Sequence, residues 1–231
     1  MRIVVTAGPT REYLDPVRFL SNPSTGKMGF AIAAEAAKRG HDVTLIAGPV
    51  SLPTPKNVKR IDVVSAREML SAVTSTLFPL PSSLSPLTSS LSPLTSSLSA
   101  LISTAAVADW RPAKCAAKKL KKTEMSGTLR LVRNPDILKT ISKLSKPSKP
   151  PKPLTLIGFA AETNDVLEEA ARKCREKNLA FIVANDVTQK GSGFGTDTNK
   201  VTFVFPDGTM KTFPLMTKRR VAVEILKELE Q

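Results

Sequence analysis

The residues best suited to chemistry form a short loop at 21–29, with the sequence Ser-Asn-Pro-Ser-Thr-Gly-Lys-Met-Gly. The loop follows an apolar strand and leads into a helix that is predicted to begin near Gly29. A helix start exposes backbone N–H groups and carries partial positive charge. The loop therefore predicts a phosphate or carboxylate site, although an ordinary strand-to-helix turn also needs small residues. The residues of this predicted phosphate loop are Ser24, Thr25, Gly26 and Lys27.

This loop matches neither of the common phosphate-binding motifs. Met28 stands where a P-loop has the Ser or Thr that binds magnesium, and no glycine lies five residues before Gly26. The spacing G-x-G-x-x-G of dinucleotide-binding proteins is also absent after the first strand. An anion site here would be of another type.

Two further segments carry charge that could act on an anionic substrate. Asp109 follows a predicted strand at 100–107, where open α/β sheets bind ligands, and it could hold Mg²⁺ against phosphates. A helix-cap or turn role explains an Asp equally well. Lys118, Lys119, Lys121 and Lys122 could form a flexible basic flap over a triphosphate, or only a solvated loop.

The later part of the chain contains two weaker candidates. Asn134-Pro135-Asp136 is typical of a helix start before the apolar run that begins at Ile137, and this structural role is sufficient to explain it. Lys173 and Lys177 are four residues apart on a predicted helix, so both could reach one anion or form a solvated face.

Apolar strands and amphipathic helices alternate along most of the chain, which predicts an α/β fold with a mostly parallel sheet and helices on both faces. The C-terminal part is predicted to form a small β-hairpin and a closing amphipathic helix. The predicted strands are 3–6, 43–47, 60–64, 100–107, 154–159, 181–184, 201–205 and 210–213, and the predicted helices are 29–39, 65–76, 166–177 and one around 221–229.

Two segments interrupt this alternation. Residues 79–99 consist almost entirely of Ser, Pro, Leu and Thr, and a seven-residue unit at 85–91 is repeated at 92–98. A basic, proline-rich segment follows at 143–153. Both are predicted to be exposed, because long surface loops cost little entropy. The chain is thus read as one domain, 1–231, with a loop insertion at 78–99 and a connector at 143–153.

Composition limits the possible functions. The net charge of +14, from 34 Lys and Arg against 20 Asp and Glu, favours anionic partners. Aromatic residues are only 5% and avoid the basic runs, so nucleic acid is the least favoured of these partners. His41 is the single histidine, which excludes a histidine-based zinc site. Cys115 and Cys174 suit a reducing compartment, and the absence of a long apolar run predicts a cytoplasmic protein without a membrane segment.

Nine segments in the same order carry a resemblance to a known family. They are 8–12, 15–18, 21–30, 48–52, 105–109, 119–122, 134–137, 158–163 and 184–187. The chain closely resembles bacterial phosphopantothenoylcysteine synthetase, or phosphopantothenate–cysteine ligase, of coenzyme A biosynthesis. The resemblance covers nearly everything except residues 78–99 and 143–153.

The resemblance implies a Rossmann-like fold and a two-step ligation. CTP would activate the carboxylate of 4′-phosphopantothenate as an acyl-cytidylate and release pyrophosphate, with Mg²⁺ as cofactor. The amine of L-cysteine would then attack and release CMP. Family members are homodimers, and the small C-terminal β-hairpin is predicted to be a dimerisation element. Many members are fused behind a flavin-dependent decarboxylase. Because the chain begins at the synthetase strand, we expect that decarboxylase on a separate protein.

The same resemblance implies roles for individual residues. Asn22 should orient the substrate carboxylate and the acyl-cytidylate, Lys119 should act on the triphosphate, and Asp109 should lie near Mg²⁺ and the nucleotide. Arg18 and Lys27 should contact anions. Positions that match nucleotide contacts are Asn134, Pro135, Asp136, Ile137, Phe159, Lys173 and Lys177, and those that match a pantothenate-facing strand end are Ala105 and Ala106.

Two other functions compete with this one. An NAD(P)-dependent Rossmann enzyme would need a glycine fingerprint and usually a catalytic tyrosine, whereas the only tyrosine is Tyr13, within a loop. A basic nucleic-acid-binding module would show affinity that falls steeply with salt and no small-molecule turnover.

Overall fold

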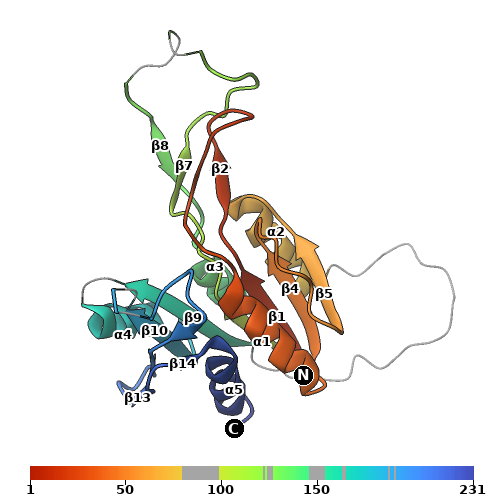
Figure 1. The fold of residues 1–231 in the computed structure, drawn as a ribbon, viewed down its shortest axis with the longest axis vertical. Helices are drawn as coiled ribbons and strands as arrows, with labels where there is room; N and C mark the ends of the chain where they lie inside the picture. Colours follow the sequence, from red (N-terminus) through yellow and green to blue (C-terminus); the bar gives the residue numbers. More distant parts are fainter. Residues whose placement is uncertain are drawn as a thin grey trace, which may run out of the picture.

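A central sheet organises the protein, which was analysed as a computed structural model. The structure describes residues 1–79, 99–121, 123, 127–145, 154–162, 165–186, 188–189 and 191–231. Within these ranges the central sheet has eight strands, in the order β13-β12-β10-β9-β6-β1-β4-β5 (Figure 1). The strands are β1 (Arg2–Ala7), β4 (Asp42–Ala47), β5 (Val58–Asp62), β6 (Ser99–Ser103), β9 (Thr155–Glu162), β10 (Phe181–Asp186), β12 (Val201–Val204) and β13 (Met210–Thr212).

The six strands β1, β4, β5, β6, β9 and β10 are parallel to one another. At one edge β12 pairs antiparallel with β10, and β13 pairs antiparallel with β12. Numbered along the chain, the parallel strands lie in the order 3-2-1-4-5-6, which is the Rossmann arrangement. The prediction of an α/β fold with a mostly parallel sheet is confirmed. The predicted C-terminal hairpin is also present, and it extends the sheet through pairing of β12 with β10.

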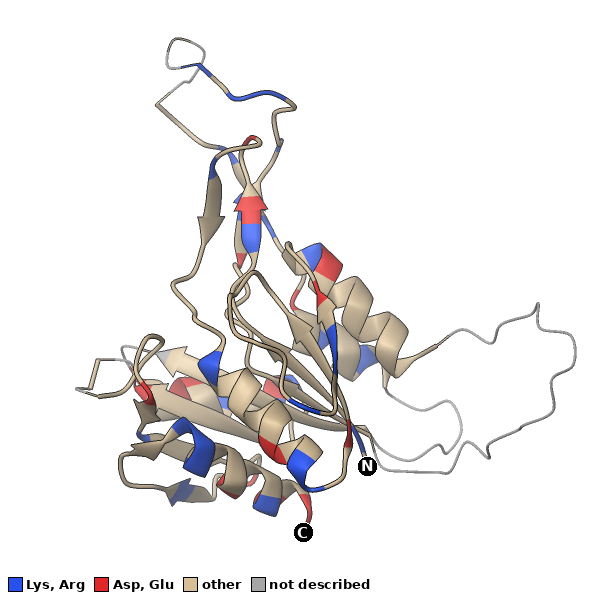
Figure 2. Cartoon of the chain, turned by 45° about the vertical axis from the view of Figure 1, so that its right-hand side comes forward, with Lys and Arg blue, Asp and Glu red and all other residues tan. Residues whose placement is uncertain are grey.

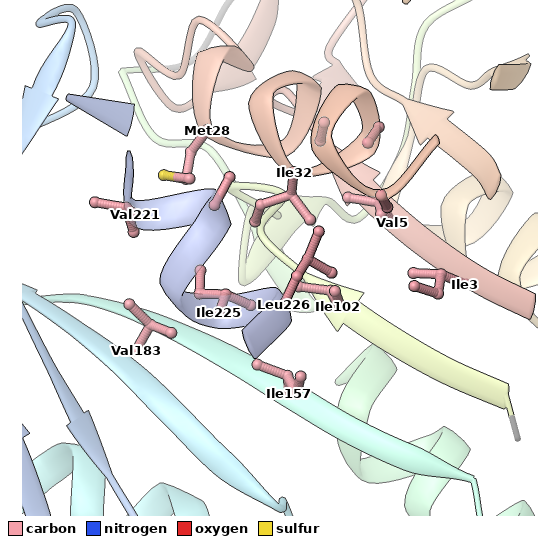
Figure 3. Close-up of a cluster of buried hydrophobic side chains, with 14 of the residues drawn as sticks. Ile3, Val5, Met28, Ile32, Ile102, Ile157, Val183, Val221, Ile225 and Leu226 are labelled. Atoms are coloured by element: carbon pink, nitrogen blue, oxygen red, sulfur yellow. The ribbon is translucent and has the colours of Figure 1, made fainter. Parts of the chain in front are cut away.

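Helices cover both faces of the sheet, as the sequence predicted. One face carries α1 (Lys27–Lys38) and α5 (Lys218–Leu229), and the other carries α2 (Ala66–Leu77), α3 (Ile137–Leu144) and α4 (Val166–Glu176). Figure 3 shows Ile32 of α1 and Leu226 of α5 in the same buried cluster as the sheet residues Val5 and Ile102. Because both faces are buried, the central strands are continuous apolar runs, which made them visible in the sequence.

A long projection, which we call the arm, extends from the body of the molecule (Figure 1). It comprises residues 11–21 and the described residues among 110–133. The first part is a hairpin of β2 (Arg11–Tyr13) and β3 (Phe19–Ser21), and the second pairs β7 (Trp110–Pro112) with β8 (Leu131–Arg133). Strand β2 packs against β7. Each strand has only three residues, too few for a recognisable alternation in the sequence.

The predicted strand at 100–107 is too long, because β6 ends at Ser103. The Thr104 hydroxyl donates to the carbonyl of Thr6 at 2.6 Å, and Ala106 forms an isolated bridge with Pro9. The chain thus leaves the sheet and crosses the end of β1. The prediction that Asp109 lies at the end of a strand is therefore wrong. Asp109 lies immediately before β7, in the arm.

The two predicted irregular segments are only partly described. Residue Ser99 belongs to β6, whereas residues 80–98 of the predicted insertion lie outside the described residues. Lys143 and Leu144 belong to α3, so the predicted connector begins too early, and its residues 146–153 lie outside the described residues.

Lysine and arginine residues are spread over the arm, the helices and the strands, and acidic residues lie among them (Figure 2). No helix in the part of the chain that the structure describes is long and apolar enough to cross a lipid bilayer.

Candidate active site

A pocket lies where the order of the parallel strands reverses, beside β1 and β6. Successive connections leave these two strands toward opposite faces of the sheet, and this divergence opens a crevice in which Rossmann-like proteins bind ligands. The pocket is lined by Ser24, Thr25, Gly26, Lys27, Met28, Gly29, Thr104, Phe159, Ala160, Ala161, Asn185, Gly193, Phe194, Asn199 and Lys218. The structure therefore brings the predicted phosphate loop together with Phe159.

The start of α1 forms one wall of this pocket. The helix begins at Lys27, and its N-cap residue Gly26 has a left-handed φ of 79° and makes no side-chain cap. The first turn contains no acidic residue, so nothing within the helix neutralises the positive end of its dipole. The helix also approaches β1 closely, because a Cβ on Gly29 would lie 2.5 Å from the Cβ of Ala7. This contact aims the uncapped helix start at the pocket.

The opposite wall was not predicted from the sequence. It is the segment Gly191–Asp197, Gly-Ser-Gly-Phe-Gly-Thr-Asp, which we call the glycine loop. The Thr25 hydroxyl donates to the carbonyl of Phe194 at 2.7 Å, and Lys27 Nζ donates to the carbonyl of Gly195 at 3.1 Å. Three glycines at alternate positions were the signal that could have indicated this wall.

The charge of Lys27 is compensated inside the protein. Its Nζ lies 2.7 Å from Asp197 Oδ1, and the Lys27 side chain is 34% exposed. This ion pair also holds the pKa of the Asp197 carboxyl below its usual value. An anion bound at the helix start would share Lys27 with Asp197.

Asn22 lies beside the two alanines with which the resemblance associates it. Its Nδ2 donates to the carbonyls of Ala106 at 3.1 Å and Val107 at 3.2 Å. The backbone N–H of Ala106 in turn donates to the carbonyl of Gly8 at 2.9 Å. Asn22, Ala105 and Ala106 are thus held together at the end of β1. Both N–H groups of the Asn22 amide are occupied, so Oδ1 is the atom left for a ligand.

Arg18 is engaged in holding the arm together. The buried carboxylate of Asp15 accepts from Arg18 Nε at 3.0 Å and from the backbone N–H of Leu120 at 3.2 Å. Arg18 also donates to the carbonyl of Leu120 at 3.0 Å. The Arg18 guanidinium keeps the pKa of Asp15 well below its usual range. We call these contacts among Asp15, Arg18 and Leu120 the clasp. Lys119 directly precedes Leu120, is exposed, and makes no hydrogen bond or ion pair with a described residue.

The remaining predicted nucleotide contacts form a second group that does not line the pocket. The backbone N–H of Asn134 donates to the carbonyl of Asp109 at 2.7 Å, and its side chain donates to the carbonyl of Ala108 at 2.8 Å. Asp136 lies at the helix start that the sequence predicted, where it caps α3 by accepting from the N–H of Lys139, and it pairs with Lys177 Nζ at 2.9 Å. Burial opposes the charge on Asp136, but these contacts lower its pKa overall.

Other members of this second group have mainly structural surroundings. Ile137 is the first residue of α3 and is buried in the core, and Pro135 directly precedes the N-cap residue of that helix. Lys173 lies in the last turn of α4, whereas Lys177 lies one residue beyond the helix as its C-cap. The prediction that both lysines lie within one helix is therefore wrong. Both are near the same helix end, but only Lys173 belongs to the helix.

Asp109 is the best-placed candidate for a magnesium ligand. Its side chain is exposed and makes no hydrogen bond or ion pair with a described residue. Within the described ranges no three His, Cys, Asp or Glu side chains form a metal-binding group. A single free carboxylate suits Mg²⁺ that is carried mainly by substrate phosphates, since this ion is often bound by one or two carboxylates and phosphate oxygens.

Comparison with known proteins shows which family the chain belongs to. The profile of the DNA/pantothenate metabolism flavoprotein C-terminal domain matches residues 1–79 and 83–231. The chain belongs to this family.

Relatives in two distant bacteria are similar over nearly the whole chain. The coenzyme A biosynthesis bifunctional protein CoaBC of Vibrio vulnificus (strain YJ016) is 45% identical over 230 residues, which are 99% of this chain and 51% of the relative. CoaBC of Bacillus subtilis (strain 168) is 44% identical over 228 residues, 98% of this chain and 50% of the relative. The chain thus spans about half the length of the curated relatives it matches.

Solved structures agree with this relationship. The crystal structure of the C-terminal domain of CoaBC has 41% sequence identity and a TM-score of 0.74, with 99% of this chain and 93% of that chain covered. A DNA/pantothenate metabolism flavoprotein from Streptococcus pneumoniae has a TM-score of 0.75 at 22% identity, with 100% and 98% covered, and supports the fold alone.

Proposed function

We propose that this protein is a phosphopantothenate–cysteine ligase that uses CTP. The observation that carries the proposal is the uncapped start of α1 at the reversal of strand order, with Asn22 fixed beside Ala106. The relatives named coenzyme A biosynthesis bifunctional proteins support the same pathway. With one histidine in the chain, positioning and charge stabilisation must supply most of the catalysis.

The proposed reaction has two steps. A carboxylate oxygen of 4′-phosphopantothenate attacks the α-phosphorus of CTP, and the bond to the β-phosphate breaks to release pyrophosphate. The amine nitrogen of L-cysteine then attacks the acyl carbon, the bond to the cytidylate oxygen breaks, and CMP leaves as the amine loses a proton. Lys119 and the start of α1 would stabilise phosphate charge in the first step, and Asn22 would orient the acyl group in the second.

Asp109 would hold Mg²⁺ against the nucleotide phosphates. The ion would neutralise part of the charge on the leaving pyrophosphate. Asn134 fixes the backbone of Asp109 through the 2.7 Å hydrogen bond, so its contribution to nucleotide binding would include positioning this carboxylate. Phe159 lies in the pocket wall, where its ring can contact the ligand.

We also propose that the protein acts as a homodimer in which the arm forms the contact. Val17, Phe19, Trp110, Leu129 and Leu131 are large apolar side chains of the arm that are between 39% and 57% exposed. Exposed apolar surface of this kind is typical of a protein interface. A second copy would let the arm of one subunit bring Lys119 to the pocket of the other.

Turnover of 4′-phosphopantothenate and L-cysteine with Mg²⁺ tests the function, with CTP compared with ATP and both pyrophosphate and product followed. CTP-dependent product supports the proposal, whereas a folded protein without turnover contradicts it. A mixture of inactive Asn22→Asp and Lys119→Gln subunits tests the shared site, because activity should return only if two chains build one site. A separate flavin-dependent decarboxylase and a cytoplasmic location stay predictions.

A further inference from the structure

Lys218 is a buried cation in the pocket wall that the proposed reaction does not yet use. It is the first residue of α5 and only 6% exposed. Its Nζ donates to the carbonyls of Gly193 at 2.9 Å, Phe194 at 3.3 Å and Thr196 at 2.6 Å. These three contacts use all three N–H groups of the ammonium. The side chain is therefore fixed in one orientation.

This arrangement is costly for the fold. Lysine is almost never fully buried without a paired charge, and no described carboxylate forms an ion pair with Lys218. A cation at the first position of a helix also opposes the helix dipole. An uncharged side chain could fill the same space without this loss of stability. We therefore infer that the charge of Lys218 has a role in the pocket.

The three contacts determine how the glycine loop presents its backbone. Carbonyl oxygens of Gly193, Phe194 and Thr196 point to Lys218, and the oxygen of Phe194 also accepts from Thr25. In a planar trans peptide the N–H group points opposite to the carbonyl. The N–H groups that follow these carbonyls, on Phe194, Gly195 and Asp197, are thereby turned away from Lys218. They make no hydrogen bond to a described residue.

We propose that Lys218 is a positioning residue for the phosphate groups of the ligand in this pocket. It holds the glycine loop against the start of α1 and adds a fixed positive charge to the wall, so that two sets of backbone N–H groups can receive one polyanion. The inference rests on the proposed function, since it identifies what binds the anionic part of the substrate at the same site.

The electrostatic surroundings of Lys218 make the charge adjustable. Burial, and to a smaller extent the positive charge of Lys27 of α1, lower the pKa of Lys218 to about 8, while Asp197 of the glycine loop opposes this shift. The ammonium is thus charged at neutral pH and loses a proton above about pH 8. A bound polyanion would favour the charged form, so binding above that pH should take up a proton.

The first test measures binding of CTP and of pyrophosphate to the full chain, without cysteine, between pH 7 and 9.5. Wild-type affinity should fall about tenfold above pH 8, because loss of the Lys218 charge removes its attraction for the polyanion and weakens its hold on the glycine loop, an effect about as large as one charge-assisted contact. Lys218→Met should bind both ligands about tenfold more weakly at pH 7 and show no such pH dependence. Calorimetry of CTP binding in two buffers of different ionisation enthalpy should detect proton uptake at pH 8.5 in the wild type only, because the CTP triphosphate is already fully ionised at that pH.

Two variants control for a merely structural effect. Lys227→Met removes a lysine from the same helix that is 51% exposed and paired with Glu224, and it should bind both ligands as the wild type does. Lys218→Arg keeps the charge and should retain more affinity than Lys218→Met. In turnover, Lys218→Met should raise the KM for CTP and leave the KM for cysteine unchanged.

The outcomes separate the two proposals. If the wild type turns over its substrates, and Lys218→Met has the same KM for CTP and the same pH dependence of binding as the wild type, the inference is wrong. If the wild type turns over no substrate, the proposed function fails, and pyrophosphate binding to the two proteins still decides the role of Lys218. If Lys218→Met does not fold, a flat pH profile of wild-type CTP binding above pH 7.5 overturns the inference, and proton uptake on CTP binding supports it.

Discussion

Replacing Gly29 by alanine should weaken both the fold and the site, although alanine is the better helix former. A Cβ at this position would lie 2.5 Å from the Cβ of Ala7, 2.5 Å from Oγ1 of Thr104 and 3.1 Å from the carbonyl oxygen of Thr6. Carbon atoms in contact are normally about 3.5–4.0 Å apart, so α1 would have to move by about 1 Å. Thr104 cannot rotate away without losing its 2.6 Å hydrogen bond to Thr6.

The expected magnitude follows from two opposing terms. Overpacking of this kind costs about 3 kcal/mol at the upper end of the usual range, because the neighbours are backbone or short side chains. The better helix propensity of alanine returns about 1 kcal/mol. The free energy of unfolding should therefore fall by about 2 kcal/mol, which lowers the Tm by about 4–8 °C for a chain of this size.

Thermal unfolding followed by circular dichroism measures this change, and turnover measures the KM for CTP, which should rise as the helix start moves. Gly195→Ala is the matched control, because a Cβ there meets no heavy atom within 4 Å and the residue has no left-handed φ. Its Tm should stay within about 1 °C of the wild type. A Gly29→Ala protein as stable as the wild type would refute the close contact between α1 and β1.

Three further changes test other parts of the site. Asn22→Asp should still release pyrophosphate but form little product, since a carboxylate cannot donate to the Ala106 and Val107 carbonyls; normal ligation would remove Asn22 from the mechanism. Lys119→Gln should block the first step, and pyrophosphate release at the wild-type rate would contradict its role. Asp15→Asn should loosen the arm at pH 7 and speed its cleavage by trypsin. In the wild type, Asp15 stabilises the arm fully above about pH 4, the usual Asp pKa, and this contribution is lost only as the pH falls through the lowered pKa of the folded state. If the wild type and Asp15→Asn are equally sensitive to acid and to trypsin, these contacts do not hold the arm.

The sequence predicted the core of the fold because its signals are local. Strands such as β1 and β4 are buried on both faces and therefore read as apolar runs. The start of α3 was recognisable because an N-cap side chain acts within four residues, and Asp136 does accept from Lys139. The three-residue strands of the arm carry no such signal, since their pairing depends on contacts between distant segments.

The candidate site shows the same division. The helix start after the predicted phosphate loop could be recognised because a helix start has its own sequence signature, whereas the binding of phosphate there stays a prediction. The glycine loop and Lys218 could not be assigned to it, since they lie more than 160 residues further along the chain. Asp109 was misplaced because the end of β6 is determined by bonds from Thr104 to Thr6, which the local sequence does not reveal.

By itself, the sequence determined which segments become strands and helices, because burial and capping act over a few neighbouring residues. It also determined that the chemistry must use amide, ammonium and carboxylate groups with almost no histidine. Only the tertiary structure decided which of these groups meet. The order of the strands in the sheet places the loops after β1, β6, β9 and β10 at one edge, and this order arises from packing of the whole chain rather than from any single segment.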